Sequence, residues 1–176
     1  MFLQTNRLIL RNFTSNDLDD LSHLLANEEV MRFSVGGPLP RNQVKDFLEN
    51  RIIGHYAQYG FSLYAVVHAK DNRVIGCAGF MLQSIAEEEF FELGYRLDPS
   101  FWGKGLAFEA AETLIEYGFN TLHFDQIISI IDPRNNRSLK VASRAGMRYW
   151  KDATFHGIEV QIYTIRKVAV SKYNLE

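Results

Sequence analysis

The clearest potential for chemistry in this sequence lies in a glycine-rich turn at residues 97–107, LDPSFWGKGLA. Gly103 and Gly105 let the backbone bend and approach a ligand closely, because neither residue has a Cβ atom. Ala107 keeps the first turn of the following helical segment thin. The amides from Gly103 to Phe108 precede the first intrahelical hydrogen bonds, so with the helix dipole they form an anion site suited to a pyrophosphate.

Two common phosphate motifs do not fit this turn. The Walker A spacing is absent, and the dinucleotide fingerprint G-x-G-x-x-G requires a third glycine where Phe108 stands. The turn also follows about four predicted strands, whereas the dinucleotide motif opens the first strand of its unit. A turn with a purely geometric role stays an open alternative, as does binding of a nucleotide phosphate.

A second polar element follows the apolar residues 126–131, at Asp132–Ser138. A strand–helix–strand pattern of this length places the two strands parallel and adjacent, with their carboxyl ends at one edge of the sheet. Asn135 and Ser138 would then reach a ligand lying between the strands. The alternatives are a helix N-cap role for Asn135 and a surface position in the first helical turn for Ser138.

The elements that must position these residues form a mixed α/β pattern, which predicts one domain over residues 1–176. Thr14 followed by Asp17 predicts a helix start, and two glycines and two prolines within 33–40 predict a loop. The predicted strands cover residues 7–11, 61–67, 74–81, 90–97, 126–131, 147–152 and 159–168. The predicted helices cover about 14–27, 44–52, 105–122 and 137–145, and the last is closed by Gly146 as a left-handed residue.

Composition narrows the class of protein. The chain has 176 residues, of which 47% are hydrophobic, and 19 basic against 21 acidic residues give a net charge of −2. This balance argues against a broad nucleic-acid surface. No apolar run is long enough to span a membrane, and the first eleven residues do not resemble a signal peptide. The single cysteine, Cys77, is predicted in the core, and a cytoplasmic protein without a membrane partner is expected. The five histidines show no metal spacing, so no metal is predicted.

Taken together, these motifs resemble the GCN5-related N-acetyltransferase (GNAT) superfamily, and within it the RimJ/RimL-like branch that acetylates ribosomal-protein N-termini. Gly105-Leu106-Ala107 matches the end of the family signature [QR]-x-x-G-x-[GA], with Trp102 in its first position. The opening TNRLILR at residues 5–11 is similar to the branch's T-x-R-L-x-L-R. Asn135-x-x-Ser138, followed by a glycine at the helix end, resembles its N-x-x-S helix. The resemblance covers about residues 5–166.

The resemblance implies a fold in which the parallel fourth and fifth strands splay apart around acetyl-CoA. It implies that the main chain near Leu97 pairs with the pantetheine, that the turn amides hold the pyrophosphate, and that Asn135 and Ser138 contact the pantetheine and thioester. Lys104 is expected to meet a CoA phosphate or solvent. The predicted cofactor-binding residues are Leu97, Trp102, Gly103, Lys104, Gly105, Leu106, Ala107, Phe108, Asn135 and Ser138.

The implied reaction is direct attack of a primary amine on the thioester, with no covalent enzyme intermediate. The acceptor is either a protein N-terminal α-amine or a small-molecule amine. An α-amine, with a pKa of about 7.7–8.0, loses its proton near neutrality more easily than a lysine-like amine with a pKa of about 10.4. The reaction needs a base that removes the amine proton and an acid that protonates the leaving thiolate. It also needs a hydrogen-bond donor to the oxyanion, which is expected to be a main-chain amide near Leu97.

Ser138 is the candidate acid and Glu92 the candidate base. The tyrosine acid of many family members would stand four residues after Ser138, where this chain has Ala142. Ser138 would replace it directly or through water. For Glu92, a solvent-facing strand carboxylate is the alternative, and Asp152 or a water path is the alternative base.

The acceptor pocket is expected to be shaped by residues 14–60. Aromatic residues that could line the acceptor pocket, or belong to the core instead, are Tyr95, Trp102, Tyr149, Trp150 and Tyr163. Charged residues interpreted as surface charge are Arg41, Arg51, Lys140, Arg144 and Glu87–Glu89. A catalytically weak acyl-CoA-binding regulatory module is the second functional hypothesis, and a monomer or homodimer is expected.

Overall fold

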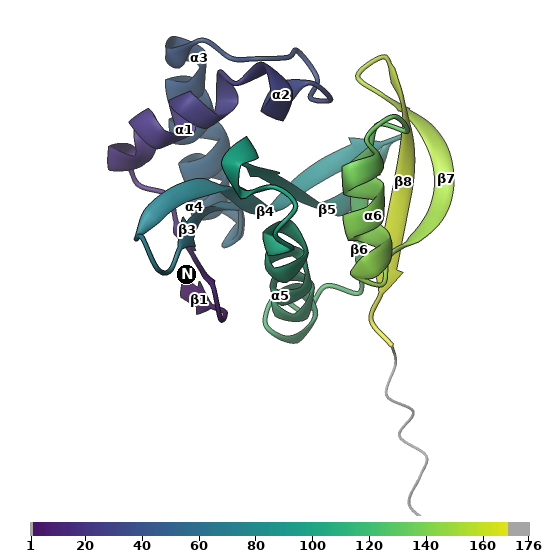
Figure 1. Cartoon of the computed structure of the whole chain (residues 1–176). Coiled ribbons are helices and arrows are strands. Elements are labelled where there is room, and N and C mark those ends of the chain that lie inside the picture. The colour runs from purple at the N-terminus through teal and green to yellow at the C-terminus, as the bar shows by residue number, and fades with distance from the viewer. Residues whose placement is uncertain (1, 169–176) are drawn as a thin grey trace, which may run out of the picture.

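The computed structural model describes residues 2–168, whose strands form one eight-stranded mixed sheet with helices on both faces (Figure 1). The strand order is β1-β2-β3-β4-β5-β6-β8-β7, and every neighbouring pair is antiparallel except β5 and β6. The strands are β1 (Phe2–Gln4), β2 (Leu8–Asn12), β3 (Leu63–His68), β4 (Arg73–Ile85), β5 (Glu88–Leu97), β6 (Gln126–Ile131), β7 (Arg148–Phe155) and β8 (Ile158–Arg166). The predicted α/β fold with a mixed sheet is therefore confirmed. Residues 1 and 169–176 of the predicted domain lie outside the described residues.

The helices form two groups, one on each face of the sheet (Figure 1). On one face are α1 (Leu18–Leu25), α2 (Glu28–Met31), α3 (Arg41–Asp46) and the π-helical segment η2 (Phe47–Ile53). The helical run continues as α4 (Gly54–Tyr59), whose Tyr56 packs against the core on the other face. On the other face are α5 (Leu106–Asn120) and α6 (Asn136–Arg144), preceded by the short 3₁₀ turn η3 (Pro99–Phe101). A second 3₁₀ turn, η1 (Ser15–Asp17), leads into α1.

Strand β3 shows why both faces are covered. Leu63 and Ala65 pack in the core beneath α1 and η2, whereas Tyr64 and Val66 pack in the core beneath α5. Successive side chains on a strand point to opposite faces, so an unbroken apolar strand requires cover on both sides. Cys77 is fully buried in the first of these cores, as predicted.

The helical region before the sheet differs from its predicted division. One helix was expected over about 14–27, but α1 ends at Leu25 and a separate helix, α2, begins after Asn27. Asn27 starts α2 because its side-chain oxygen accepts hydrogen bonds from the amides of Glu29 (2.9 Å) and Val30 (3.2 Å). The helix expected near 44–52 is instead a continuous helical run from 41 to 59 that includes η2. Strand β1 was not predicted, because three residues are too short to show a period.

The parallel pair β5 and β6 lies in the interior of the sheet and is only loosely joined. Glu92 and Ile128 are the one registered pair between these strands among the described residues. The Ser129 hydroxyl also bridges the strands by donating to the Leu93 carbonyl at 2.8 Å. Toward their carboxyl ends the described residues of the two strands have no further registered pair, which agrees with the predicted splay.

Candidate active site

The glycine-rich turn leads from β5 into α5 and has the geometry that its sequence predicted. Gly103 and Gly105 have φ values of +74° and +77°, in the left-handed region that favours glycine. The first main-chain hydrogen bond of α5 runs from the Glu109 amide to the Gly105 carbonyl, at 3.1 Å. Among the described residues, the amides of 103–108 therefore have no main-chain acceptor and are free to bind an anion.

Three side chains hold this turn in place. Arg7 donates to the Lys104 carbonyl at 2.8 Å and forms an ion pair with Glu109 in the first turn of α5, at 2.6 Å. The Trp102 indole N–H donates to the Leu97 carbonyl at 2.7 Å. Thr5 also donates to the Glu109 carboxylate. The TNRLILR segment, noticed in the sequence only as a resemblance, thus contributes Thr5 and Arg7 as positioning residues for the turn.

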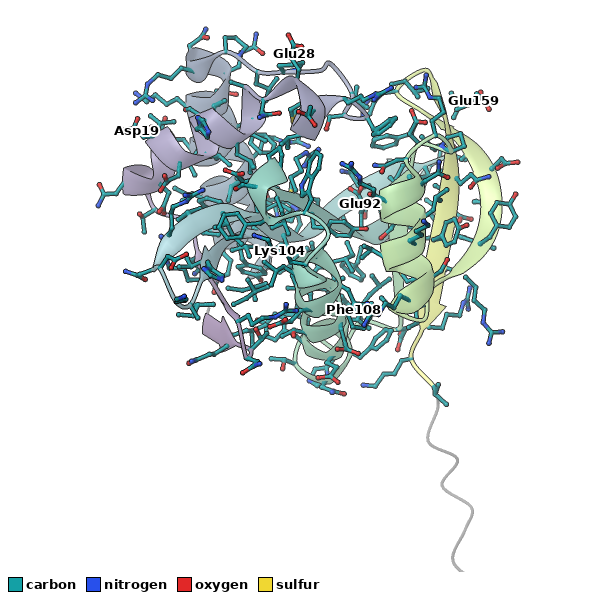
Figure 2. All side chains as sticks on the ribbon, viewed as in Figure 1. Asp19, Glu28, Glu92, Lys104, Phe108 and Glu159 are labelled. Carbon is teal, nitrogen blue, oxygen red and sulfur yellow. The ribbon has the colours of Figure 1, made fainter. Side chains whose placement is uncertain are left out.

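A cleft of about 370 Å³ opens between the turn, the end of β5 and α6. We call it the turn cleft. The predicted cofactor-binding residues that line it are Leu97, Trp102, Gly103, Gly105, Leu106, Ala107, Phe108, Asn135 and Ser138. Lys104 does not line the cleft; it is exposed, with its ammonium 5.0 Å from the centre of the Phe101 ring (Figure 2).

Helix α6 adds a row of positive charge to the turn cleft. Arg137, Lys140 and Arg144 all line it. The Arg137 guanidinium carbon lies 4.4 Å from the centre of the Trp102 ring, and that of Arg144 lies 4.1 Å from the centre of the Phe108 ring. The sequence analysis assigned Lys140 and Arg144 to the surface and did not single out Arg137. Their spacing of three and four residues, which places side chains on one helix face, was the available signal.

Asn135 and Ser138 stand at the start of α6. The Asn135 side-chain oxygen accepts from the Ser138 amide at 3.2 Å, so Asn135 is a helix N-cap, as its alternative interpretation held. The Ser138 carbonyl accepts from the Tyr95 hydroxyl at 3.3 Å. The remaining polar atoms of Asn135 and Ser138, the amide nitrogen and the hydroxyl, have no hydrogen-bond partner among residues 2–168.

A second, polar pocket of about 220 Å³ lies on the other face of β5. We call it the Glu92 pocket. Glu92, Gly94 and Arg96 share one face of β5, and the Cβ of a side chain at Gly94 would meet only the Glu92 carboxylate, at 4.0 Å. The missing side chain thus leaves open space between an acid and a guanidinium. The outer wall comes from residues 30–51, within the segment expected to shape an acceptor pocket.

Glu92 has the environment of a base. It is half-buried near the middle of the molecule (Figure 2), and its carboxylate accepts from the Gln83 side chain at 2.8 Å. Burial raises the pKa of Glu92, while the Gln83 hydrogen bond and the Arg96 charge act in the opposite direction. A carboxylate with a raised pKa accepts a proton more readily near neutral pH. Asp152, the alternative base, is exposed on β7 and lines neither cavity.

Of the five predicted pocket aromatics, two line the turn cleft or the Glu92 pocket. Tyr95 lines both, and burial raises its pKa to about 12, so its hydroxyl stays protonated. Trp102 lines the turn cleft. Tyr149 is 51% exposed and packs edge-on against Tyr163, while Trp150 packs against Phe90.

The two cavities meet at the gap between β5 and β6. Tyr95, Arg96, Asn135 and Ser138 line both of them. The Asp98 amide donates to the Ile75 carbonyl of the neighbouring strand β4 at 2.8 Å. Main-chain groups of successive residues in an antiparallel strand point alternately to its two sides. The amides and carbonyls of residues 93, 95 and 97 therefore point away from β4, toward the gap.

Two of these main-chain groups are already bound. The Leu93 carbonyl accepts from Ser129 and the Leu97 carbonyl from Trp102. The amide and carbonyl of Tyr95 and the amide of Leu97 remain to pair with an extended ligand.

Within residues 2–168, no three His, Cys, Asp or Glu side chains are arranged to hold a metal ion. None of the helices in that range has the length and apolar character to cross a bilayer.

Comparison with known proteins defines the class. The sequence profile of the acetyltransferase (GNAT) domain matches residues 7–148, so the chain belongs to this family. The resemblance seen in the sequence is thereby confirmed, as is the prediction of an N-acetyltransferase enzyme.

Several named relatives share this assignment. The chain is 32% identical over 149 residues to the uncharacterized protein YkkB of Bacillus subtilis (strain 168), covering 85% of this chain and 86% of that one. It is 28% identical over 173 residues to the uncharacterized N-acetyltransferase p20 of Bacillus licheniformis, covering 94% and 96%. A ribosomal protein uS5-alanine N-acetyltransferase of Escherichia coli (strain K12) is 31% identical over 107 residues, covering 57% and 54%.

Solved structures show the same fold. A GNAT-family acetyltransferase from Bacillus anthracis aligns with a TM-score of 0.80 and 23% identity, covering 94% of this chain and 98% of that one. RimL, a ribosomal alpha-N-protein acetyltransferase in complex with coenzyme A, aligns with a TM-score of 0.79 and 18% identity, covering 94% and 98%.

Proposed function

We propose that this chain transfers the acetyl group of acetyl-CoA to a primary amine by direct attack on the thioester. The observation that carries the proposal is the gap between β5 and β6, which joins an anion-binding cleft on one face of the sheet to a carboxylate pocket on the other. Relatives named for N-acetyltransfer and a structural neighbour with bound coenzyme A support it.

In this proposal acetyl-CoA lies in the turn cleft. The amides of 103–108 and the side chains of Arg137, Lys140 and Arg144 bind its phosphates, because both groups offer donors or positive charge to an anion. The pantetheine pairs with the free main-chain groups of Tyr95 and Leu97, with Asn135 and Ser138 beside the thioester. Lys104 has no part in this arrangement beyond its main chain.

The amine enters from the Glu92 pocket and meets the thioester at the gap. Glu92 takes the proton from the attacking nitrogen, directly or through water, as the carbonyl carbon becomes tetrahedral. The amide of Tyr95 or Leu97 donates to the oxyanion. Collapse of this intermediate breaks the carbon–sulfur bond, and the Ser138 hydroxyl relays a proton to the leaving thiolate, receiving a proton from water as it donates its own. The acceptor is a protein N-terminal α-amine or a small amine.

Ligand-induced stabilisation tests the cofactor assignment. Acetyl-CoA at about 100 times its Kd is expected to stabilise the fold by about 2.7 kcal/mol, because it binds the folded state only. ATP and NADH are expected to shift the melting temperature little. A larger shift with either of them would favour the nucleotide-binding alternative.

An acetyl-transfer screen tests the activity. With radiolabelled acetyl-CoA and a panel of peptides and small amines, the proposal expects saturable transfer and a mass gain of one acetyl group on an acceptor. Ala142 favours one competing function, a catalytically weak acyl-CoA-binding module, because this buried residue carries no proton to donate. Saturable binding of CoA without transfer to any amine would establish that module instead.

A further inference from the structure

The Glu92 pocket contains more positive charge than a site for a simple amine requires. Its three charged side chains are Glu92, Arg51 of η2 and Arg96 of β5. An amine arrives at neutral pH as a cation, which a carboxylate attracts and guanidinium groups repel. One of the three charges therefore suits the amine, and the other two need a different explanation.

Of the twelve arginines within residues 2–168, seven form no ion pair with a carboxylate, and Arg51 and Arg96 are two of these seven. Five arginines elsewhere form ion pairs with carboxylates, namely Arg7, Arg11, Arg41, Arg73 and Arg134. Among residues 2–168, neither Arg51 nor Arg96 forms an ion pair. Both line the same small pocket.

Arg96 is the more informative of the pair. It is half-buried, and its Nε and Nη2 atoms donate to the Ser34 hydroxyl at 3.2 Å each. A hydroxyl orients the guanidinium but does not neutralise it. Removing a charge from water without an opposite charge is costly, so a partly buried, oriented and unpaired guanidinium is poised for an anion.

The spacing along β5 separates the two kinds of charge. Glu92 and Arg96 are four residues apart on one strand face, so their Cα atoms are roughly 13 Å apart. Gly94 lies between them with no side chain to fill the space. A ligand above Gly94 can therefore present a cationic group to Glu92 and an anionic group to Arg96. The pocket volume of about 220 Å³ lies below the roughly 300–1,000 Å³ of drug-sized sites, so the occupant is a small group.

We propose that the acceptor carries a carboxylate besides its primary amine, and that this carboxylate binds Arg51 and Arg96 while the amine faces Glu92. Guanidinium and carboxylate geometries match, which favours this pairing. The inference rests on the proposed acetyltransferase function and adds the acceptor class to it. The carboxylate belongs either to a free amino acid or to an acidic residue near a protein N-terminus. An acceptor with several positive charges and no anion is disfavoured.

Matched acceptor pairs test this assignment. Initial rates of CoA release are measured for two pairs of acceptors. The first pair is glycine and glycinamide, and the second is the C-terminally amidated peptides Ala-Glu and Ala-Gln. Spermidine serves as an acceptor that carries only positive charge. The wild-type protein is expected to favour the carboxylate member of at least one pair by about tenfold or more in kcat/KM, consistent with a hydrogen bond to a charged group. The pair that shows the preference identifies the source of the carboxylate.

The Arg51→Ala variant is expected to reduce this preference by about tenfold, lowering kcat/KM for the carboxylate acceptor more than for its amide. Arg96→Lys keeps the charge without the planar fork and is expected to reduce it in the same direction. Arg41→Ala is the matched control, because Arg41 pairs with Asp19 on the exposed surface. Equal rates on carboxylate and amide, faster reaction of spermidine, or an unchanged preference in Arg51→Ala would overturn the inference.

A binding experiment distinguishes failure of this inference from failure of the proposed acetyltransferase function. If acetyl-CoA binds but no amine is acetylated, the acetyltransferase proposal fails. Titration of glycine and of the amidated Ala-Glu peptide into the CoA-saturated protein then decides the pocket assignment alone. Binding that Arg51→Ala weakens would support a carboxylate site, whereas no binding of either would overturn it.

Discussion

The turn cleft and the Glu92 pocket lie on opposite faces of β5 and are built in different ways. The turn cleft uses main-chain amides and a row of cations from two contiguous segments, at 97–108 and 135–144, and is also lined by Glu29, Val30 and Phe33. The Glu92 pocket uses side chains from α2 and the loop after it, η2, β4 and β5, which lie far apart in the sequence. A cleft built from main-chain amides depends little on residue type and suits a cofactor that stays the same from one enzyme to another. A pocket built from side chains changes when its residues change, so it can be adapted to different acceptors.

The strongest way to break the turn cleft is Gly105→Glu. Its carboxylate would stand among the amides of 103–108 and repel the phosphates of the ligand. We expect acetyl-CoA affinity to fall by about 100-fold or more, since like charges in contact cost several kcal/mol. Isothermal titration measures the effect. Gly157→Glu is the matched control, because Gly157 has a similar φ of +79° in the β7–β8 turn and borders neither cavity. Equal losses in both variants would mean that backbone strain, and not the phosphate site, was disturbed.

The Glu92 pocket is tested by Glu92→Gln, which removes the base and keeps the side-chain shape. Turnover is expected to fall by about 10²–10⁴-fold. Acetyl-CoA affinity should change little, because Glu92 does not line the turn cleft. Steady-state kinetics and titration give the two numbers. Glu89→Gln, an exposed carboxylate on the same strand, is the control. A fall in turnover below tenfold would leave water as the base.

Ser138→Ala probes one of the residues that line both cavities. Turnover should fall by about 10²–10⁴-fold if Ser138 supplies the proton to the thiolate. Loss of one ordinary hydrogen bond would cost about tenfold at most. The control is Ser143→Ala, at an exposed position of α6. A smaller loss, or one confined to acetyl-CoA affinity, would make Ser138 a binding residue. Tyr149, exposed outside the cavities, is a poor substitute for it, whereas the Tyr95 hydroxyl lies beside α6.

The smallest expected effect is a shift in pH dependence. Glu92 acts as a base only when deprotonated, and burial raises its pKa, so activity should be lost at a higher pH than for an ordinary carboxylate as the pH falls. Gln83→Met removes a hydrogen bond that lowers this pKa. The acid limb of kcat/KM should then move to higher pH. If the acid limb does not move in Gln83→Met, the group that titrates there is not Glu92.

The turn cleft could be predicted from the sequence more fully than the Glu92 pocket, because its residues are close together along the chain. The turn was predictable because Gly103, Gly105 and the helix pattern after them are local, and helix geometry alone fixes which amides are free. The parallel strands followed from the strand–helix–strand pattern. Glu92 was recognised from its position on β5, but the sequence could not tell a buried from a solvent-facing carboxylate, since that depends on Gln83 and on residues 30–51.

Other features depended on contacts that no local pattern contains. Arg7 fastens a turn almost 100 residues away, and Arg51 became part of a pocket only because α2 and η2 fold over β5. Asp152 and Tyr149 were plausible from their strand alone, yet that strand lies at the sheet edge beyond β8. Sequence periodicity fixes the face of a strand and not its distance from the gap.

Amide hydrogen exchange with and without coenzyme A tests directly whether the cofactor binds in the turn cleft and not in the Glu92 pocket. The account predicts slower exchange on CoA binding in peptides that contain residues 103–108, because their free amides gain phosphate acceptors. It predicts unchanged exchange in peptides from η2, which lines the Glu92 pocket and not the turn cleft. Protection of η2 with no change at 103–108 would place the cofactor on the wrong face and contradict the account.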